Sequence, residues 1–330
     1  MSSSLARVAA VHRGGLELIT ETGPRAGFVT GRLRHGAASA DLPAVGDWVT
    51  CDPESGAVHA VRERTSALVR AAKDGRAAQI LAANVDVVVV VASLTRELNL
   101  GRIERMLTLA ADAPADAVVV LSKADLVADP AAQVAEVRAA LGGAVPVLPV
   151  SSVDGSGLDA VAALLGPGVT GVLLGASGVG KTSLLNALTG GERATGPIRE
   201  ADDRGRHTTT WRELVPLAGG GVVIDTPGLK LPRIWEQASG LASVFSDVEA
   251  LARTCRFADC RHAGEPGCAV ADAVGDGRLA PERLAAHEQL GREQAWAESR
   301  RDEAARRRRK DATRRIHREQ RRIQRAKGGR

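Results

Sequence analysis

The chain has 330 residues and a formal net charge of +5 at pH 7, with 44% hydrophobic and 25% charged residues. That length is enough for two or three domains with a sizeable core. The longest apolar runs, such as Val85–Ala92, are far shorter than the ~20 residues of a membrane helix, and the N-terminus lacks a convincing apolar signal region. We therefore expect a cytoplasmic protein that does not bind a membrane.

The first part of the chain, from Arg7 to about Leu68, consists of short apolar segments broken by Gly, Pro and Asp. This spacing predicts a small β-barrel or β-sandwich. We take residues 1–70 as one domain.

Longer apolar segments follow, separated by alanine-rich stretches of helical character. Examples are the strand-like Val85–Ala92, the helix-like Leu100–Asp112 and the strand-like Asp116–Ser122. This alternation predicts an α/β domain with a mainly parallel sheet over residues 71–239.

A glycine-rich loop lies inside this domain, between an apolar strand and a helix-like stretch. The sequence from Gly175 to Thr182, GASGVGKT, fits the pattern G-x-x-x-x-G-K-[ST] at every fixed position. In such a loop the backbone N–H groups and the start of the helix bind phosphate oxygens. Lys181 would bridge the outer phosphates, and Thr182 would coordinate Mg²⁺.

The segment VVIDTPG supplies a second phosphate-binding element. Asp225 at the end of an apolar strand would hold Mg²⁺, and the amide of Gly228 would contact a γ-phosphate. Between the two elements lies GRHTTTW, in which Thr209, with Thr208 as the rival, could complete the Mg²⁺ ligands.

These phosphate elements do not distinguish GTP from ATP. The usual guanine-reading motif, [NT]-K-x-D, is absent from the sequence after Gly228, but SKAD occurs upstream at residues 122–125 and VSS at residues 150–152. Both follow apolar strands, where α/β sheets present ligand loops. The order predicts a circularly permuted GTPase in which Asp125 reads guanine, Lys123 packs along the base and the backbone near Ser151 and Ser152 meets the guanine carbonyl. An ATPase is disfavoured by Asp125.

The predicted GTP-binding residues share these loops. They are Ser122, Lys123, Ala124, Asp125, Ser151, Ser152, Gly175, Ala176, Ser177, Gly178, Val179, Gly180, Lys181, Thr182, Ser183 and Gly228, with Thr182, Thr209 and Asp225 for magnesium.

Three of the four cysteines cluster with a histidine. Cys255, Cys260, His262 and Cys268 follow the spacing C-x4-C-x-H-x5-C. Three thiolates and one imidazole can bind a single structural Zn²⁺ and leave no open position for catalysis. Short helices around this cluster define a zinc-binding domain over residues 240–298. Cys51 stands apart and is expected to be a buried small residue.

The positive charge is concentrated in a tail. Residues 299–330 hold 15 Lys and Arg against 4 Asp and Glu, a net charge of +11, which leaves −6 for the rest of the chain. We expect this Arg-rich tail to be a solvent-exposed helix or disordered.

Together these motifs resemble the RsgA or YjeQ family of ribosome-dependent GTPases. The resemblance covers nearly the whole chain: the segment LPAVGDWV at residues 42–49, the permuted order SKAD, VSS, GASGVGKTS, GRHTTT and DTPG, and the Cys/His cluster. It implies an N-terminal OB-fold, a central permuted GTPase and a C-terminal zinc domain. It also implies GTP hydrolysis stimulated by the small ribosomal subunit during late maturation. We expect the chain to be a monomer.

Two positions depart from common GTPase patterns. Ser122 replaces the usual Asn and lacks the amide that would tie the base loop to the phosphate loop, so weaker nucleotide binding is expected. Leu229 stands where many GTPases have a water-positioning Gln, and the resemblance therefore makes His207 the candidate that positions the attacking water.

The sequence leaves two functions open. The first is an rRNA-bound GTPase that acts as an assembly checkpoint, and the second is a zinc-dependent rRNA-binding scaffold with a structural nucleotide site. An OB-like barrel and the basic tail could both bind RNA, the tail through salt-dependent phosphate contacts. With three Phe, four Trp and no Tyr, extensive base stacking is not expected. The intact nucleotide motifs favour the first function.

Overall fold

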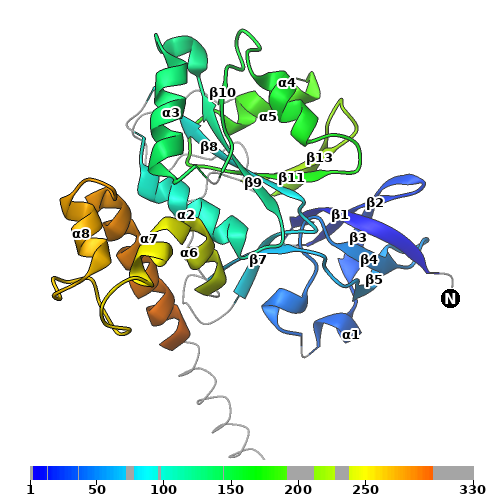
Figure 1. The fold of residues 1–330 in the computed structure, drawn as a ribbon. Helices are drawn as coiled ribbons and strands as arrows, with labels where there is room; N and C mark the ends of the chain where they lie inside the picture. Colours follow the sequence, from blue (N-terminus) through cyan, green and yellow to red (C-terminus); the bar gives the residue numbers. More distant parts are fainter. Residues whose placement is uncertain are drawn as a thin grey trace, which may run out of the picture.

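A computed structural model describes residues 3–12, 14–35, 37–71, 78–95, 98–143, 145–191, 212–226 and 238–299. A β-barrel, an α/β sheet and a helical region follow one another along the chain (Figure 1). The predicted multidomain fold class is therefore confirmed. Within the described ranges, no helix is long and apolar enough to cross a membrane.

The N-terminal strands form a closed barrel. Its strands pair antiparallel except for β3 and β5, which are parallel, and pairing of β1 with β4 closes the ring. This connectivity is that of an OB-fold. The strands are β1 (Ser4–His12), β2 (Gly15–Thr20), β3 (Gly23–Val29), β4 (Trp48–Cys51) and β5 (Ala57–Val61), with a helical turn α1 (Gly31–Arg34) and a 3₁₀ turn η1 (Ser39–Asp41) before β4.

Every second side chain along the strands faces inward and fills the barrel. Along β2, Leu16 and Leu18 are buried while Glu17 and Ile19 face outward. This period of two is what a sheet with one buried face requires. Cys51 is fully buried in the same core, as expected.

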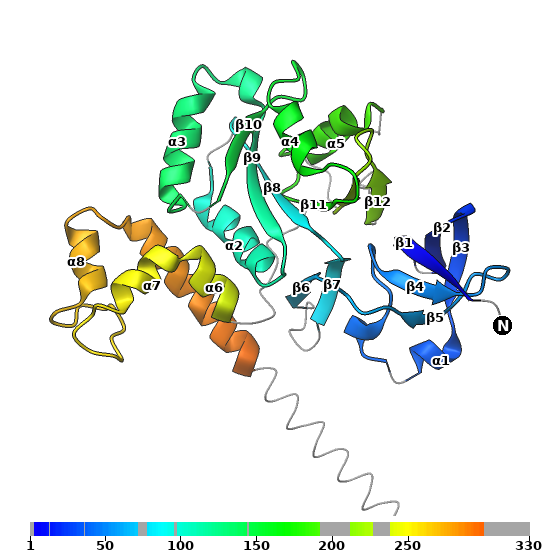
Figure 2. The same ribbon diagram turned by 45° about the vertical axis from the view of Figure 1, so that its right-hand side comes forward.

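The central sheet carries the order β10-β9-β8-β11-β13-β12. All neighbours are parallel except β12 and β13. The strands are β8 (Val87–Ser93), β9 (Asp116–Ser122), β10 (Val147–Val150), β11 (Thr170–Leu174), β12 (Glu213–Pro216) and β13 (Val222–Asp225). Among the described residues, the register pair of Ala10 with Glu213 joins this sheet to the barrel. A ribbon of β6 (Ala67–Ala71) and β7 (Ala78–Ala83) lies between the two (Figure 2).

Helices cover both faces of the sheet. Ile103 of α2 and Val134 of α3 pack on one face, and Val161 of α4 and Leu184 of α5 pack on the other. Strand β8 is buried on both sides, which explains its unbroken run of valines. The helices are α2 (Leu100–Ala111), α3 (Pro130–Ala140), α4 (Leu158–Leu164) and α5 (Lys181–Thr189), with a 3₁₀ turn η2 (Ala124–Leu126) after β9.

The C-terminal helices form a small body with its own core around Phe245 and Val248. They are α6 (Ala238–Val244), α7 (Ser246–Ala252) and α8 (Ala269–Gly275), followed by a helical stretch over residues 281–299. This body lies against α2 of the sheet domain (Figure 2).

Buried ion pairs join the helical body to α2. Arg283 donates to Glu104 of α2 at 2.7 Å and to both carboxylate oxygens of Asp247, and its guanidinium lies 4.7 Å from the centre of the Phe245 ring. Only 6% of the Arg283 side chain and 4% of the Glu104 side chain are exposed. A second bidentate pair, Arg105 with Glu293, lies nearby. The contact is therefore charged as well as apolar.

Replacing Arg283 with methionine is expected to lower the free energy of unfolding by about 3–5 kcal/mol, because Glu104 would stay buried without its partner. Arg278→Met, which removes an exposed ion pair with Asp276, should change the free energy of unfolding far less, because water and salt screen exposed charges. Urea unfolding of both variants tests this. Equal destabilisation by the two would contradict a buried network.

Candidate functional site

The carboxyl ends of four of the five parallel strands bring the predicted nucleotide loops to one edge of the sheet. Strand β11 leads into the glycine-rich loop, β13 ends at Asp225, and β9 and β10 lead into SKAD and VSS. The register pairs Ser122 with both Ser93 of β8 and Val150 of β10. Segments that are far apart in the sequence therefore meet where open α/β sheets bind ligands.

The glycine-rich loop has the conformation that its sequence predicts. Gly178 and Gly180 have φ values of +78° and +93°, and a side chain at Gly175 would meet the Val91 carbonyl oxygen at 2.6 Å. Helix α5 begins at Lys181, directly after the loop. Thr182 and Ser183 lie in its first turn, where free N–H groups favour an anion.

Lys181 is buried at the base of this loop. Its Nζ donates to the carbonyl oxygens of Gly175 and Ala176, both at 2.9 Å. Burial lowers the pKa of the Lys181 ammonium, and the charge of Asp225 partly offsets that effect. The loop thus holds its lysine against the backbone that would surround a phosphate chain.

Asp225 is buried at the end of β13 and pairs in register with Leu173 of β11. The next residue, Thr226, is fully buried, and its hydroxyl donates to the Leu173 carbonyl at 2.6 Å. This bond fixes the backbone just after Asp225. Thr226 is not among the site residues predicted from the sequence. The only sequence signal for it was its place directly after Asp225 in the DTPG segment.

The SKAD loop is tied directly to the phosphate loop. The Ser122 hydroxyl donates to the Val179 carbonyl at 2.5 Å and lies 3.0 Å from the Ala92 carbonyl. Lys123, whose φ is +63°, donates to the Gly178 carbonyl at 3.3 Å. The expected loss of the tie at Ser122 is therefore wrong: the backbone around Gly180 comes close enough for a short hydroxyl to reach it.

The expected result for Ser122→Ala is a loss of about tenfold in GDP affinity, because the SKAD loop loses its bond to the phosphate loop. Ser122→Asn, which keeps a donor, should retain most of the affinity. Titration of fluorescent GDP measures both, with the exposed Ser156→Ala as the control. Wild-type affinity in Ser122→Ala would show that the tie has no role in binding.

The remaining residues predicted to read the base differ in exposure. Asp125 lies on the surface in η2. Ser151 is fully buried, and its hydroxyl accepts the N–H groups of Val153 and Asp154 at 3.1 and 3.2 Å. Ser151 therefore shapes the VSS turn, and the neighbouring Ser152 is half-buried.

Four predicted residues lie outside the described part of the chain. They are His207, Thr208, Thr209 and Gly228.

The four predicted zinc ligands meet on one loop. The ligand atoms of Cys255, Cys260, His262 and Cys268 all lie within 4.8 Å of one another. The Cys255 and Cys268 sulfur atoms are 4.0 Å apart, and His262 Nδ1 lies 3.7 and 3.4 Å from them. A tetrahedral Zn²⁺ with Zn–S bonds of ~2.3 Å separates its ligand atoms by about 3.8 Å. The residues present therefore fit one zinc ion.

We expect the purified chain to contain one zinc ion, and Cys260→Ser to lose most of it because only three ligands remain. Cys51→Ala, which changes the cysteine remote from the cluster, should keep its zinc. Elemental analysis after dialysis measures both variants. Full zinc in Cys260→Ser would remove Cys260 from the ligand set.

Fold and site together define a P-loop nucleotide-binding protein in which the strands of SKAD and VSS precede the strand of the glycine-rich loop in the sequence. The profile of the RsgA GTPase family matches residues 61–235. The chain belongs to this family.

Relatives extend the match beyond the central domain. A protein from Opitutus terrae named small ribosomal subunit biogenesis GTPase RsgA is 46% identical over 98% of this chain and 92% of its own length. The protein of the same name from Streptomyces avermitilis is 46% identical over 87% of this chain and 78% of its own length. The crystal structure of YjeQ from Thermotoga maritima aligns with a TM-score of 0.64 and 28% identity, covering 88% of this chain and 97% of that one.

Proposed function

We propose that this chain is a GTPase that binds the small ribosomal subunit and acts as a late checkpoint of its assembly. The observation that carries the nucleotide assignment is the bond from Ser122 to Val179, because it joins the base-reading and phosphate-binding loops into one site. The subunit is inferred from the names of the relatives.

In this proposal the base is read by the SKAD and VSS loops. The exposed Asp125 carboxylate accepts two N–H bonds from the guanine edge, which adenine cannot donate in the same way. Lys123 lies along the base, anchored over the phosphate loop. Backbone N–H groups near Ser151 and Ser152 donate to the guanine carbonyl.

The phosphates occupy the loop from Gly175 to Gly180, and Lys181 exchanges its carbonyl contacts for the outer phosphates. The Thr182 hydroxyl and the Asp225 carboxylate are oxygen donors of the kind Mg²⁺ prefers, and Thr209 completes them. Bound Mg²⁺ neutralises charge on the phosphates. The Gly228 amide contacts the γ-phosphate and responds to its loss.

His207 positions the attacking water, since the leucine at position 229 offers no hydrogen bond. Contact with the ribosome places the His207 side chain for catalysis. Slow intrinsic turnover and strong activation by the subunit follow from that arrangement.

The remaining regions supply binding. The OB-fold of residues 1–70 and the basic tail of residues 299–330 contact rRNA, and the zinc-binding domain of residues 240–298 is held on the GTPase domain of residues 71–239 by the Arg283 network. A single zinc ion has a structural role there. The protein works in the cytoplasm as a monomer.

Co-sedimentation with isolated small subunits tests the checkpoint role. The chain with a non-hydrolysable GTP analogue should pellet with subunits, and the chain with GDP should be retained much less. Retention that does not depend on the nucleotide would favour the scaffold function, in which the nucleotide site is structural.

A further inference from the structure

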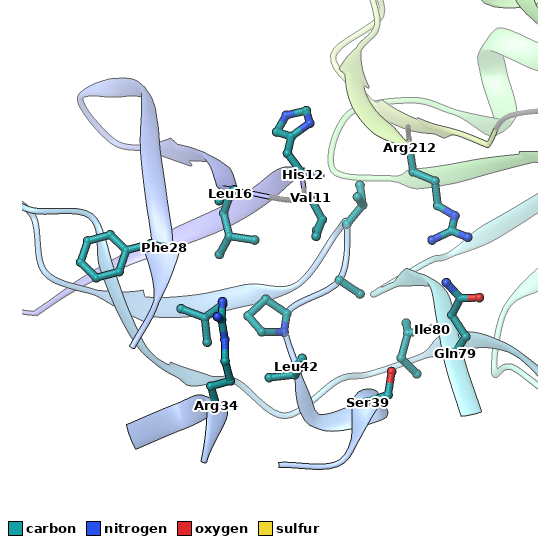
Figure 3. A pocket seen from close by; sticks show the side chains of 16 residues that line it. Val11, His12, Leu16, Phe28, Arg34, Ser39, Leu42, Gln79, Ile80 and Arg212 are labelled. Carbon is teal, nitrogen blue, oxygen red and sulfur yellow. The ribbon is translucent and has the colours of Figure 1, made fainter. Parts of the chain in front are cut away.

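A cavity of about 450 Å³, separate from the nucleotide loops, lies between the barrel, β7 and the start of β12. Its size is within the ~300–1,000 Å³ of ligand sites. Figure 3 shows Arg212 entering from the side of β12, with Arg34 across the cavity. The turn between β1 and β2, one of the loops with which OB-folds bind oligonucleotides, contributes His12, Gly14 and Gly15.

The charged groups around this cavity are positive. Arg34 and Arg212 line it, and among the described residues that do so there is no Asp or Glu. Neither guanidinium has a hydrogen-bonding partner in the described part of the chain. His12, also at the rim, pairs with Glu17 at 2.9 Å.

Two donors converge near Arg212. The Gln79 carbonyl oxygen Oε1 is already used by Arg70, which donates to it at 3.0 and 2.9 Å. The Gln79 amide nitrogen consequently faces the Arg212 guanidinium (Figure 3). Burial, and secondarily the charge of Arg70, lower the pKa of Arg212 to about 10, so the side chain remains a cation at neutral pH. Two donor groups that face each other, one of them charged, favour binding of an anionic acceptor between them.

The rest of the wall is apolar and preformed. Leu16, Leu42 and Ile80 line it, together with Phe28, which is 47% exposed. The loop that carries Leu42 is fixed by Arg64, which donates to the Leu42 carbonyl at 3.0 Å and pairs with the buried Asp47. An apolar wall between two cations fits a base or sugar flanked by phosphates.

We propose that this cavity binds one nucleotide of a single-stranded RNA segment, with its flanking phosphates on Arg34 and on Arg212 with Gln79. The inference deepens the proposed rRNA contact and is independent of GTP hydrolysis. The proposed RNA contact lies next to the sheet that carries the nucleotide loops. Glu213, the neighbour of Arg212, pairs in register with Ala10 of the barrel on one side and with Asp225 of the nucleotide site on the other.

Photocrosslinking of the full chain, loaded with GDP and Mg²⁺, tests the site. The probe is a heptauridylate with a central 4-thiouridine, and mass spectrometry maps the crosslinks. We expect crosslinks at the cavity wall, near Leu16, Phe28 or Ile80. Loss of a phosphate contact in Arg34→Gln or Arg212→Gln should reduce their yield about tenfold.

Arg32→Gln is the matched control, because it removes the same charge from the same helical turn but does not line the cavity. It should leave the yield unchanged, and GTP turnover without RNA should be unchanged in Arg34→Gln. Crosslinks only elsewhere, or equal loss in the control, would overturn the site. Equal crosslinking by free 4-thiouridine monophosphate would overturn the RNA strand as its ligand. GTPase activity is scored separately, so failure of this site leaves the proposed function standing.

Discussion

Lys181→Ala is expected to lower GTP turnover by about 100-fold, because the proposed site loses the buried ammonium that would neutralise the outer phosphates. Its Nζ donates to the Gly175 and Ala176 carbonyls, within the loop that would surround the phosphates. Steady-state phosphate release, with and without small subunits, measures the effect.

The control for Lys181→Ala is Thr189→Ala, at the far end of the same helix, whose hydroxyl donates to the helix carbonyl of Asn186 and accepts the Gly191 N–H. It should leave turnover within about twofold of the wild-type rate, because the change lies outside the site. Normal turnover in Lys181→Ala would exclude the glycine-rich loop as the catalytic phosphate site.

The second large effect is expected at Asp125. Asp125→Asn should weaken GTP binding about 100-fold, since two N–H bonds from guanine lose their charged acceptor. Xanthine carries a carbonyl where guanine carries its amino group, so the side-chain amide that this variant introduces would donate to that carbonyl. Affinity for xanthosine triphosphate should therefore rise as affinity for GTP falls.

Asp129→Asn is the matched control for this change. Asp129 is exposed in the same loop region and caps α3 by accepting the Ala132 N–H at 3.0 Å. Asparagine caps helices as well as aspartate does, so base preference and stability should both be kept. Competition titrations with GTP, ATP and xanthosine triphosphate distinguish the outcomes. An unchanged preference in Asp125→Asn would mean that guanine is read elsewhere.

Much of the fold follows from local patterns. The valine run of β8 predicts a strand buried on both faces, and the glycines of the phosphate loop predict a turn that only they can adopt. The Cys/His cluster was identified from spacing alone, because a loop of this length brings its own residues together. The permuted order of motifs also indicated the right arrangement of strands.

The features that the sequence did not predict depend on contacts between distant segments. Ser122 was expected to leave the SKAD loop untied, yet its hydroxyl reaches a carbonyl 57 positions away. The bond from Arg283 to Glu104 spans 179 positions, and no local pattern marks either residue. Arg212 directly precedes β12 and acquires its surroundings only when the barrel packs against the sheet.

The most direct test of the central claim is turnover of GTP and ATP by the purified chain, with and without isolated small ribosomal subunits, at two salt concentrations. We expect GTP turnover to rise at least about tenfold with subunits and ATP turnover to stay low, because the partner completes the catalytic site. Absence of stimulation despite tight subunit binding would contradict the GTPase checkpoint and favour a scaffold.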